Sequence, residues 1–134
     1  PNADYIGIDI FDEATREDDG TPWKPYEIAQ KLFDARGFKN YKLVKSDLRK
    51  LVQLPCSSDL VVIDAAHDFE SEYENLKLAL TADPTFIFID DVEGNETRIA
   101  IEAALCSSLK NKVDYMLPVD YIGGGLVIKL RNTL

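Results

Sequence analysis

The 134-residue sequence has few of the residues that build disulfide frameworks or metal-thiolate sites, since it holds two cysteines and one histidine. Cys56 and Cys106 lie in partly apolar settings without close metal-ligand spacing. Two reduced thiols are therefore expected, as in a cytoplasmic chain, although a disulfide between them depends on their separation and stays open. No apolar run approaches the roughly 20 residues of a membrane-spanning helix, and no signal peptide is visible.

Positive charge is also scarce, because 15 Lys and Arg face 24 Asp and Glu, for a net charge of −9. An acidic surface repels phosphates, which argues against nucleic-acid partners and against adhesion to anionic membranes. A small-molecule substrate is the expected partner. The acidic stretch over residues 12–21 is expected to form a solvated loop, with a lid over a ligand as the alternative. The length predicts a single domain over residues 1–134.

Three apolar strands, each ending in aspartate, are the most informative feature that is present. They are Tyr5 to Asp9, Leu60 to Asp64, and Phe86 to Asp90 with Asp91 following. Runs that are apolar on both faces are typical of parallel strands covered by helices. In open α/β sheets, ligands bind beyond the carboxyl ends of such strands. The alternative is that each aspartate simply starts the loop after its strand. This explains any one of the three strand ends, but it explains their repetition less well.

Helices are predicted between these strands, at residues 25–36, 69–80 and 95–109. Pro25 suits a first helical turn and Gly37 suits the left-handed position that ends a helix. Phe69, Tyr73 and Leu76 share one face of the second helix, whose first turns carry glutamates that the helix dipole favours. Another strand is expected at residues 41–45, followed by a short helix or turn over 48–54.

The last strands, at residues 113–119 and 126–130, are too close for a helical crossover and should pair antiparallel. Gly123-Gly124-Gly125 lies between them, so it predicts a hairpin turn rather than a phosphate loop. The alternation as a whole predicts an α/β fold: a doubly wound, mostly parallel, Rossmann-like sheet that ends in an antiparallel C-terminal hairpin.

This order, with Asp64-x-x-His67 after one strand and Asp90-Asp91 after the next, resembles class I S-adenosylmethionine-dependent methyltransferases. The similarity is to the second half of small-molecule and sugar O-methyltransferases, including those related to catechol O-methyltransferase. It implies an enzyme that transfers a methyl group to a hydroxyl.

The resemblance starts only at the second strand of the family fold. The family's first strand and its glycine-rich E-x-G-x-x-x-G turn have no counterpart, so the expectation is an N-terminally truncated methyltransferase. The missing strand would lie between the strands that end at Asp9 and Asp64. Direct pairing, rearrangement or a homodimer would have to close that gap.

The resemblance implies that Asp9 binds both ribose hydroxyls of S-adenosylmethionine, since a carboxylate offers two acceptor oxygens to a diol. It also implies that Asp47 or its neighbour Ser46 faces the adenine amino group. The structural alternatives stay open: Asp9 would start a loop, and Asp47 would cap the short helix that follows.

Asp64, Asp90 and Asp91 are the candidate metal ligands. Carboxylates that converge repel one another unless a cation neutralises them, and Mg²⁺ prefers oxygen ligands. In the resembling families this ion holds two neighbouring substrate oxygens and lowers the pKa of the attacking hydroxyl. The alternative is that Asp90 and Asp91 cap the next helix while Asp64 alone faces the ligand.

His67 and Asp64 are the candidate catalytic residues. His67 is a candidate general base; it could equally start the following helix or pair with Asp64. Two functional classes remain: a metal-assisted O-methyltransferase, and a truncated domain that folds, alone or as a dimer, without binding cofactor. The absent glycine turn favours the second class and the retained aspartates favour the first.

Overall fold

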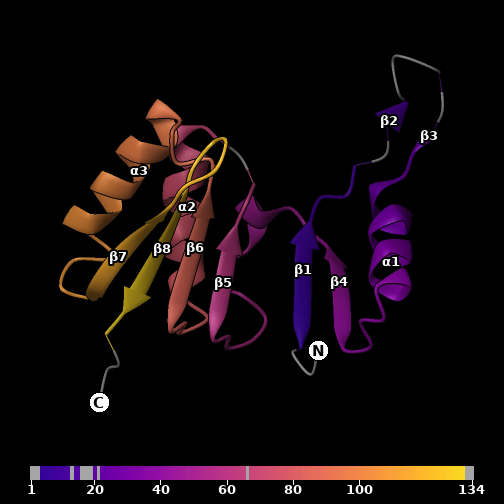
Figure 1. The fold of residues 1–134 in the computed structure, drawn as a ribbon, viewed down its shortest axis with the longest axis horizontal. Helices are drawn as coiled ribbons and strands as arrows, with labels where there is room; N and C mark the ends of the chain where they lie inside the picture. Colours follow the sequence, from indigo (N-terminus) through magenta and orange to yellow (C-terminus); the bar gives the residue numbers. More distant parts are fainter. Residues whose placement is uncertain (1–3, 13, 16–19, 21, 66, 132–134) are drawn as a thin grey trace. The chain divides into compact units, whose positions relative to one another are not determined.

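The computed structural model describes residues 4–12, 14–15, 20, 22–65 and 67–131 (Figure 1). The chain divides into two compact units, Pro1–Lys50 and Leu51–Leu134, and each has its own sheet. Residues 13, 16–19 and 21 of the expected acidic loop lie outside the described residues. None of the helices in the described ranges combines the length and the apolar content that crossing a membrane demands.

The first unit is built on two parallel strands. β1 (Tyr5–Asp9) pairs with β4 (Tyr41–Lys45), and α1 (Pro25–Ala35) connects them in sequence. A short antiparallel pair, β2 (Ala14–Thr15) and β3 (Pro22–Trp23), precedes the helix and was not predicted from the sequence. Each of these strands has two residues, which is too short for a periodic pattern to reveal.

The ends of α1 follow the expected signals. Pro25 lies in the first turn, where its missing N–H costs nothing. Gly37 has φ +73° and donates its N–H to the carbonyl of Asp34, while Phe38 donates to Phe33. This is a Schellman motif, so the prediction that Gly37 ends the helix is confirmed. A single turn of 3₁₀ helix, η1 (Leu48–Lys50), follows β4.

The second unit is a four-stranded mixed sheet with two helices. Its elements in chain order are β5 (Leu60–Ile63), α2 (Phe69–Leu80), β6 (Phe86–Asp90), α3 (Asn95–Cys106), β7 (Val113–Val119) and β8 (Gly125–Leu130). The strand order in space is β5-β6-β8-β7. β5 and β6 are parallel, whereas β8 runs antiparallel to both β6 and β7.

The α/β class and the antiparallel C-terminal hairpin are therefore confirmed, because residues 120–124 are too few for a crossover. The finer expectation, a single doubly wound, mostly parallel, Rossmann-like sheet, stays a prediction. The described residues form a two-stranded parallel sheet in one unit and a four-stranded mixed sheet in the other. The mixture arises because β8 inserts between β6 and β7, which makes two of the three strand pairs in that sheet antiparallel.

The core of the second unit lies between the sheet and its helices, which pack against each other and against one sheet face. Ile87 and Ile89 alternate toward the helices and are fully buried, while Phe86 and Phe88, which alternate with them, are only partly buried. This alternation is the period-two signature of a strand. The buried cluster consists of Ile63, Leu76, Ala79, Ile87, Ile89, Ile101, Ala104, Leu109, Ile128 and Leu130.

Candidate functional site

Three acidic side chains lie at one edge of the sheet in the second unit. Asp90 ends β6, Asp91 follows it, and Asp64 follows β5. Since β5 and β6 are parallel and Ile63 is the register partner of Ile89, the residues after them leave the sheet at the same edge. The sequence-predicted carboxylates of this unit are therefore neighbours at the carboxyl ends of the parallel strands.

His67 lies in the loop between β5 and α2 and faces Asp91. Its Nε2 is 3.6 Å from Oδ2 of Asp91, and both side chains are about half exposed. His67 does not begin α2, since Asp68 is the N-cap and accepts a hydrogen bond from the N–H of Ser71. The imidazole thus has a carboxylate partner on one side and access to solvent on the other.

Asp90 is held by a different partner, Tyr121 from the β7–β8 turn. The Tyr121 hydroxyl donates a hydrogen bond to Oδ1 of Asp90, and the N–H of Asp91 donates to the same oxygen over 2.8 Å. The bond from Tyr121 lowers the pKa of Asp90, and it raises the pKa of Tyr121 to about 12. Neither aspartate caps α3, because the N-cap is Gly94 without a side-chain cap, so that alternative was wrong.

Glu72 is a buried carboxyl group close to this edge. It lies in the first turn of α2, is 2% exposed, and its Oε2 has no hydrogen-bond partner. Burial raises the pKa of Glu72 to about 7; the nearby charge of His67 lowers it, and the charges of Asp68 and Asp64 raise it further. A carboxyl group that titrates near neutrality beside a histidine is typical of functional sites.

The fit of a divalent cation depends on how these donors are arranged. Carboxylate oxygens suit Mg²⁺ chemically. Within the described residues, however, no group of three or more His, Cys, Asp or Glu side chains is spaced to hold a metal ion. Asp90 is bonded to Tyr121 and Asp91 is paired with His67, so this arrangement does not form the predicted ligand set.

The predicted cofactor residues belong to the first unit. The main-chain carbonyl of Asp9 accepts a hydrogen bond from Ser46 over 2.8 Å, and its Oδ1 accepts one from the N–H of Phe11 over 3.2 Å. Asp9 and Ser46 are thus brought together where β1 and β4 end. One carboxylate oxygen of Asp9 is engaged locally, which is the geometry of a loop-starting aspartate.

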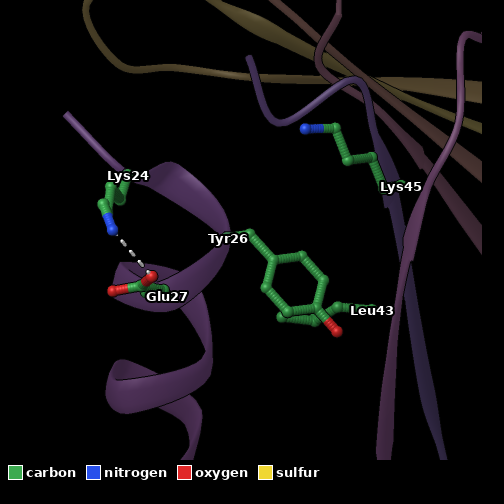
Figure 2. Close-up of a pocket in the computed structure, with 5 residues that line it drawn as sticks. All are labelled: Lys24, Tyr26, Glu27, Leu43 and Lys45. Atoms are coloured by element: carbon green, nitrogen blue, oxygen red, sulfur yellow. Dashed lines mark hydrogen bonds and ion pairs between the residues drawn. The ribbon is translucent and has the colours of Figure 1, made fainter. Parts of the chain in front are cut away.

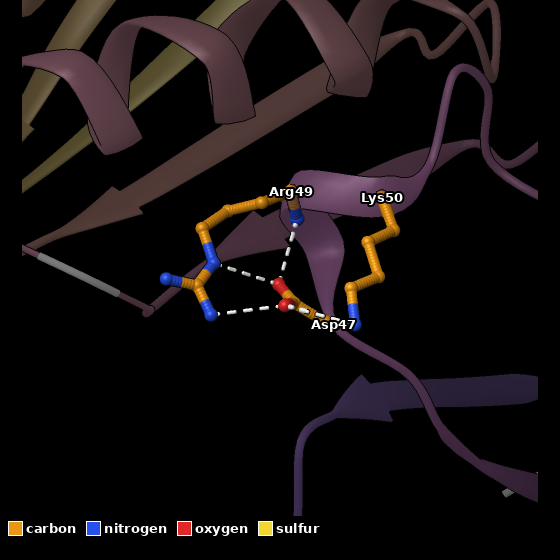
Figure 3. Close-up of polar contacts among 3 residues, drawn as sticks. All are labelled: Asp47, Arg49 and Lys50. Carbon is orange, nitrogen blue, oxygen red and sulfur yellow. Dashed lines mark hydrogen bonds and ion pairs between the residues drawn. The ribbon is translucent and has the colours of Figure 1, made fainter.

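Asp47 is engaged more fully (Figure 3). Its Oδ1 accepts from the N–H and Nε of Arg49, at 3.1 and 2.8 Å, and its Oδ2 accepts from Nη2 at 2.9 Å. The Arg49 side chain holds the pKa of Asp47 below its usual value. This geometry agrees with the alternative in which Asp47 caps the short helix that follows. A cofactor contact at Asp47 would have to compete with Arg49.

A pocket of about 330 Å³ also lies in the first unit. Its lining consists of Lys24, Tyr26, Glu27, Leu43 and Lys45 (Figure 2). Lys24 pairs with Glu27 over 3.3 Å, and Tyr26 points toward Leu43. Lys45 is the register partner of Asp9, so the pocket borders the strand end where the cofactor residues were predicted.

No protein-family model matches this chain, and no curated protein matches it significantly. The resemblance to methyltransferases therefore rests on the sequence motifs alone.

Sequence reasoning missed two residues of this edge, Glu72 and Tyr121. Glu72 was interpreted as one of several dipole-favoured glutamates, although it stands four residues before the core residue Leu76 and so shares its helix face. Tyr121 lies 31 residues beyond Asp90 in the chain. The available signal was the hairpin itself, which returns the chain toward the strand that ends at Asp90.

Proposed function

We propose that this chain carries the acid–base part of an S-adenosylmethionine-dependent methyl transfer to a hydroxyl of a small molecule. The observation that carries the proposal is the 3.6 Å contact between His67 and Asp91. It joins the two motifs on which the resemblance rests, Asp64-x-x-His67 after β5 and Asp90-Asp91 after β6. The chemical argument depends on the second unit alone.

The residues at this edge suit proton removal. With Nε2 directed at the Asp91 carboxylate, a tautomer protonated at Nε2 leaves Nδ1 to accept the proton of an attacking hydroxyl. The carboxylate then stabilises the imidazolium that forms. When bound, S-adenosylmethionine supplies a methyl group on a cationic sulfur, and the hydroxyl oxygen takes that methyl while the bonding electrons return to sulfur.

In the first unit, Asp9 and Ser46 remain the proposed cofactor contacts. The second carboxylate oxygen of Asp9 suits a ribose hydroxyl, and the pocket that Lys45 lines offers space at the same strand end. Metal assistance through Asp64, Asp90 and Asp91 remains a prediction, and it requires Asp90 to leave Tyr121 and Asp91 to leave His67.

The test is isothermal titration calorimetry of the whole chain with S-adenosylhomocysteine, with and without Mg²⁺. Heat at micromolar ligand is expected, and Asp9→Asn should weaken binding by roughly tenfold or more, because a charged hydrogen bond contributes about 1.5–3 kcal/mol. Asp4→Asn is the matched control, since Asp4 is an exposed residue that directly precedes the first residue of the same strand.

A second candidate is a domain that folds without binding cofactor. The observation in its favour is that no E-x-G-x-x-x-G turn occurs in the printed sequence. No heat with or without Mg²⁺, from a folded sample, would support this candidate and reject the enzyme. Heat that appears only with Mg²⁺ would favour the metal-assisted form.

A further inference from the structure

The β7–β8 turn, residues 120–124, packs onto the loop that follows β6. The N–H of Val92 donates to the carbonyl of Gly124 over 3.3 Å, and the N–H of Glu93 donates to that of Gly123 over 3.0 Å. These bonds lie beyond the last paired residues of the β6–β8 ladder, Asp90 and Gly125. The turn therefore extends the sheet's hydrogen bonding to the backbone that carries Asp91.

The glycines of this turn allow an approach that side chains would prevent. Gly123 has φ +93°, and a Cβ atom there would collide with the Asp91 carboxylate. Gly124 has φ +70°, and a Cβ atom there would lie 3.0 Å from Cγ of Glu93. A hairpin turn alone accounts for the positive φ of these glycines, but not for the close approach of Asp91 and Glu93. The glycines therefore allow both the turn and the close packing of the Asp91 side chain against it.

Tyr121 adds a side-chain contact to these backbone bonds. Its ring lies over Gly125, where a Cβ atom would come within 2.8 Å of the ring and of the hydroxyl oxygen. Its hydroxyl bonds to Asp90, which also accepts from the N–H of Asp91. Asp91 has φ +51°, in the left-handed region that is uncommon for residues other than glycine, although aspartate adopts it more readily than most.

We propose, on the basis of the function proposed above, that Tyr121 is a positioning residue for the proton-accepting pair. Through Asp90 it fixes the backbone that follows β6, so that the Asp91 carboxylate faces His67. The two adjacent aspartates then have different roles. Asp90 anchors the loop, and Asp91 orients the imidazole. The phenol itself needs no contact with the acceptor.

The experiment follows the ring C2-proton resonance of His67, the chain's single histidine. Asp91→Asn should shift this resonance at a fixed pH, because it removes the charge 3.6 Å from Nε2. In the Tyr121→Phe background the same substitution should produce less than about half of that shift, since the two changes act on one coupled contact. Tyr115→Phe, an exposed tyrosine on the same hairpin, should leave the full shift.

An equal shift in the native and Tyr121→Phe backgrounds would overturn the proposal. If Tyr121→Phe does not fold, the Tyr121 ring Cζ resonance decides instead. At neutral pH, Asp90→Asn should shift this resonance relative to the native protein, because the Tyr121 hydroxyl bonds to that carboxylate; an unchanged resonance would show that the bond does not hold in solution and would overturn the proposal. Neither measurement involves cofactor. A negative result in either one is therefore distinct from the absence of heat in the calorimetric test of the proposed function.

Discussion

Replacing Glu72 by glutamine should make the chain's stability less dependent on pH. Glu72 is 2% exposed, and burial raises its pKa from 4.5 to about 7. A carboxyl group whose folded-state pKa is raised stabilises the fold fully below its unfolded value, and this contribution is lost as pH rises through the folded value. The wild-type chain should therefore lose stability between about pH 4.5 and pH 7, whereas Glu72→Gln has no such group to ionise.

The size of the effect follows from the two pKa values. A rise from 4.5 to about 7 corresponds to about 3–4 kcal/mol in total, because one pKa unit is equivalent to about 1.4 kcal/mol. Integrating the linkage from pH 5 to pH 8 leaves about 2–3 kcal/mol, since part of the loss occurs below pH 5. Relative to Glu72→Gln, the wild type should become less stable by that amount over this interval. Against a typical stability of about 5–15 kcal/mol, the difference is large enough to measure.

The assay is urea denaturation of wild type and Glu72→Gln at half-unit steps from pH 5 to pH 8. Glu70→Gln is the matched control, because Glu70 lies in the same first turn of α2 with its side chain exposed. The control should follow the wild-type pH dependence. Parallel curves for wild type and Glu72→Gln would refute the reasoning, since they would mean that Glu72 ionises equally easily in the folded and unfolded chain.

Three other substitutions have defined outcomes. His67→Ala should raise the pKa of Glu72 further, because the histidine charge lowers it, and a ¹³C carboxyl titration would show this; an unchanged midpoint would contradict the coupling. Gly37→Ala should lower the free energy of unfolding, measured by urea denaturation, by about 1–2 kcal/mol. The φ of +73° strains any L side chain, even though no atom lies within 4 Å of the added Cβ. An unchanged free energy would contradict the left-handed conformation at the end of α1. Leu76→Ala should cost about 2–5 kcal/mol, since Leu76 is fully buried in the core, and a loss under about 1 kcal/mol would contradict that packing.

Local signals predicted most of the elements of this fold. The strand over residues 41–45 and the helix over 69–80 have the predicted bounds, because apolar periodicity and end signals coincide there. β8 begins one residue earlier than predicted, since Gly125 pairs with Asp90. Glycine is disfavoured in strands, so no local pattern predicts that Gly125 belongs to β8.

The candidate site was predictable only where it depends on strand ends. Parallel strands that end in aspartate were sufficient to bring Asp64 and Asp90 to one edge. The burial of Glu72 depends on how α2 packs against its neighbours, and a glutamate in a first turn is favourable on any face of a helix. Tyr121 reaches Asp90 only because β8 inserts beside β6, a long-range choice that no local pattern encodes.

The position of β8 has a consequence for how the chain folds during synthesis. Residues 125–130 are translated after every other element of the second unit, yet they occupy an interior place in its sheet. Until they leave the ribosome, β6 has an unpaired edge, and such edges invite pairing with other chains. Completion of this sheet is thus postponed until β8 has been translated, and until then the second unit carries an exposed strand edge that favours aggregation.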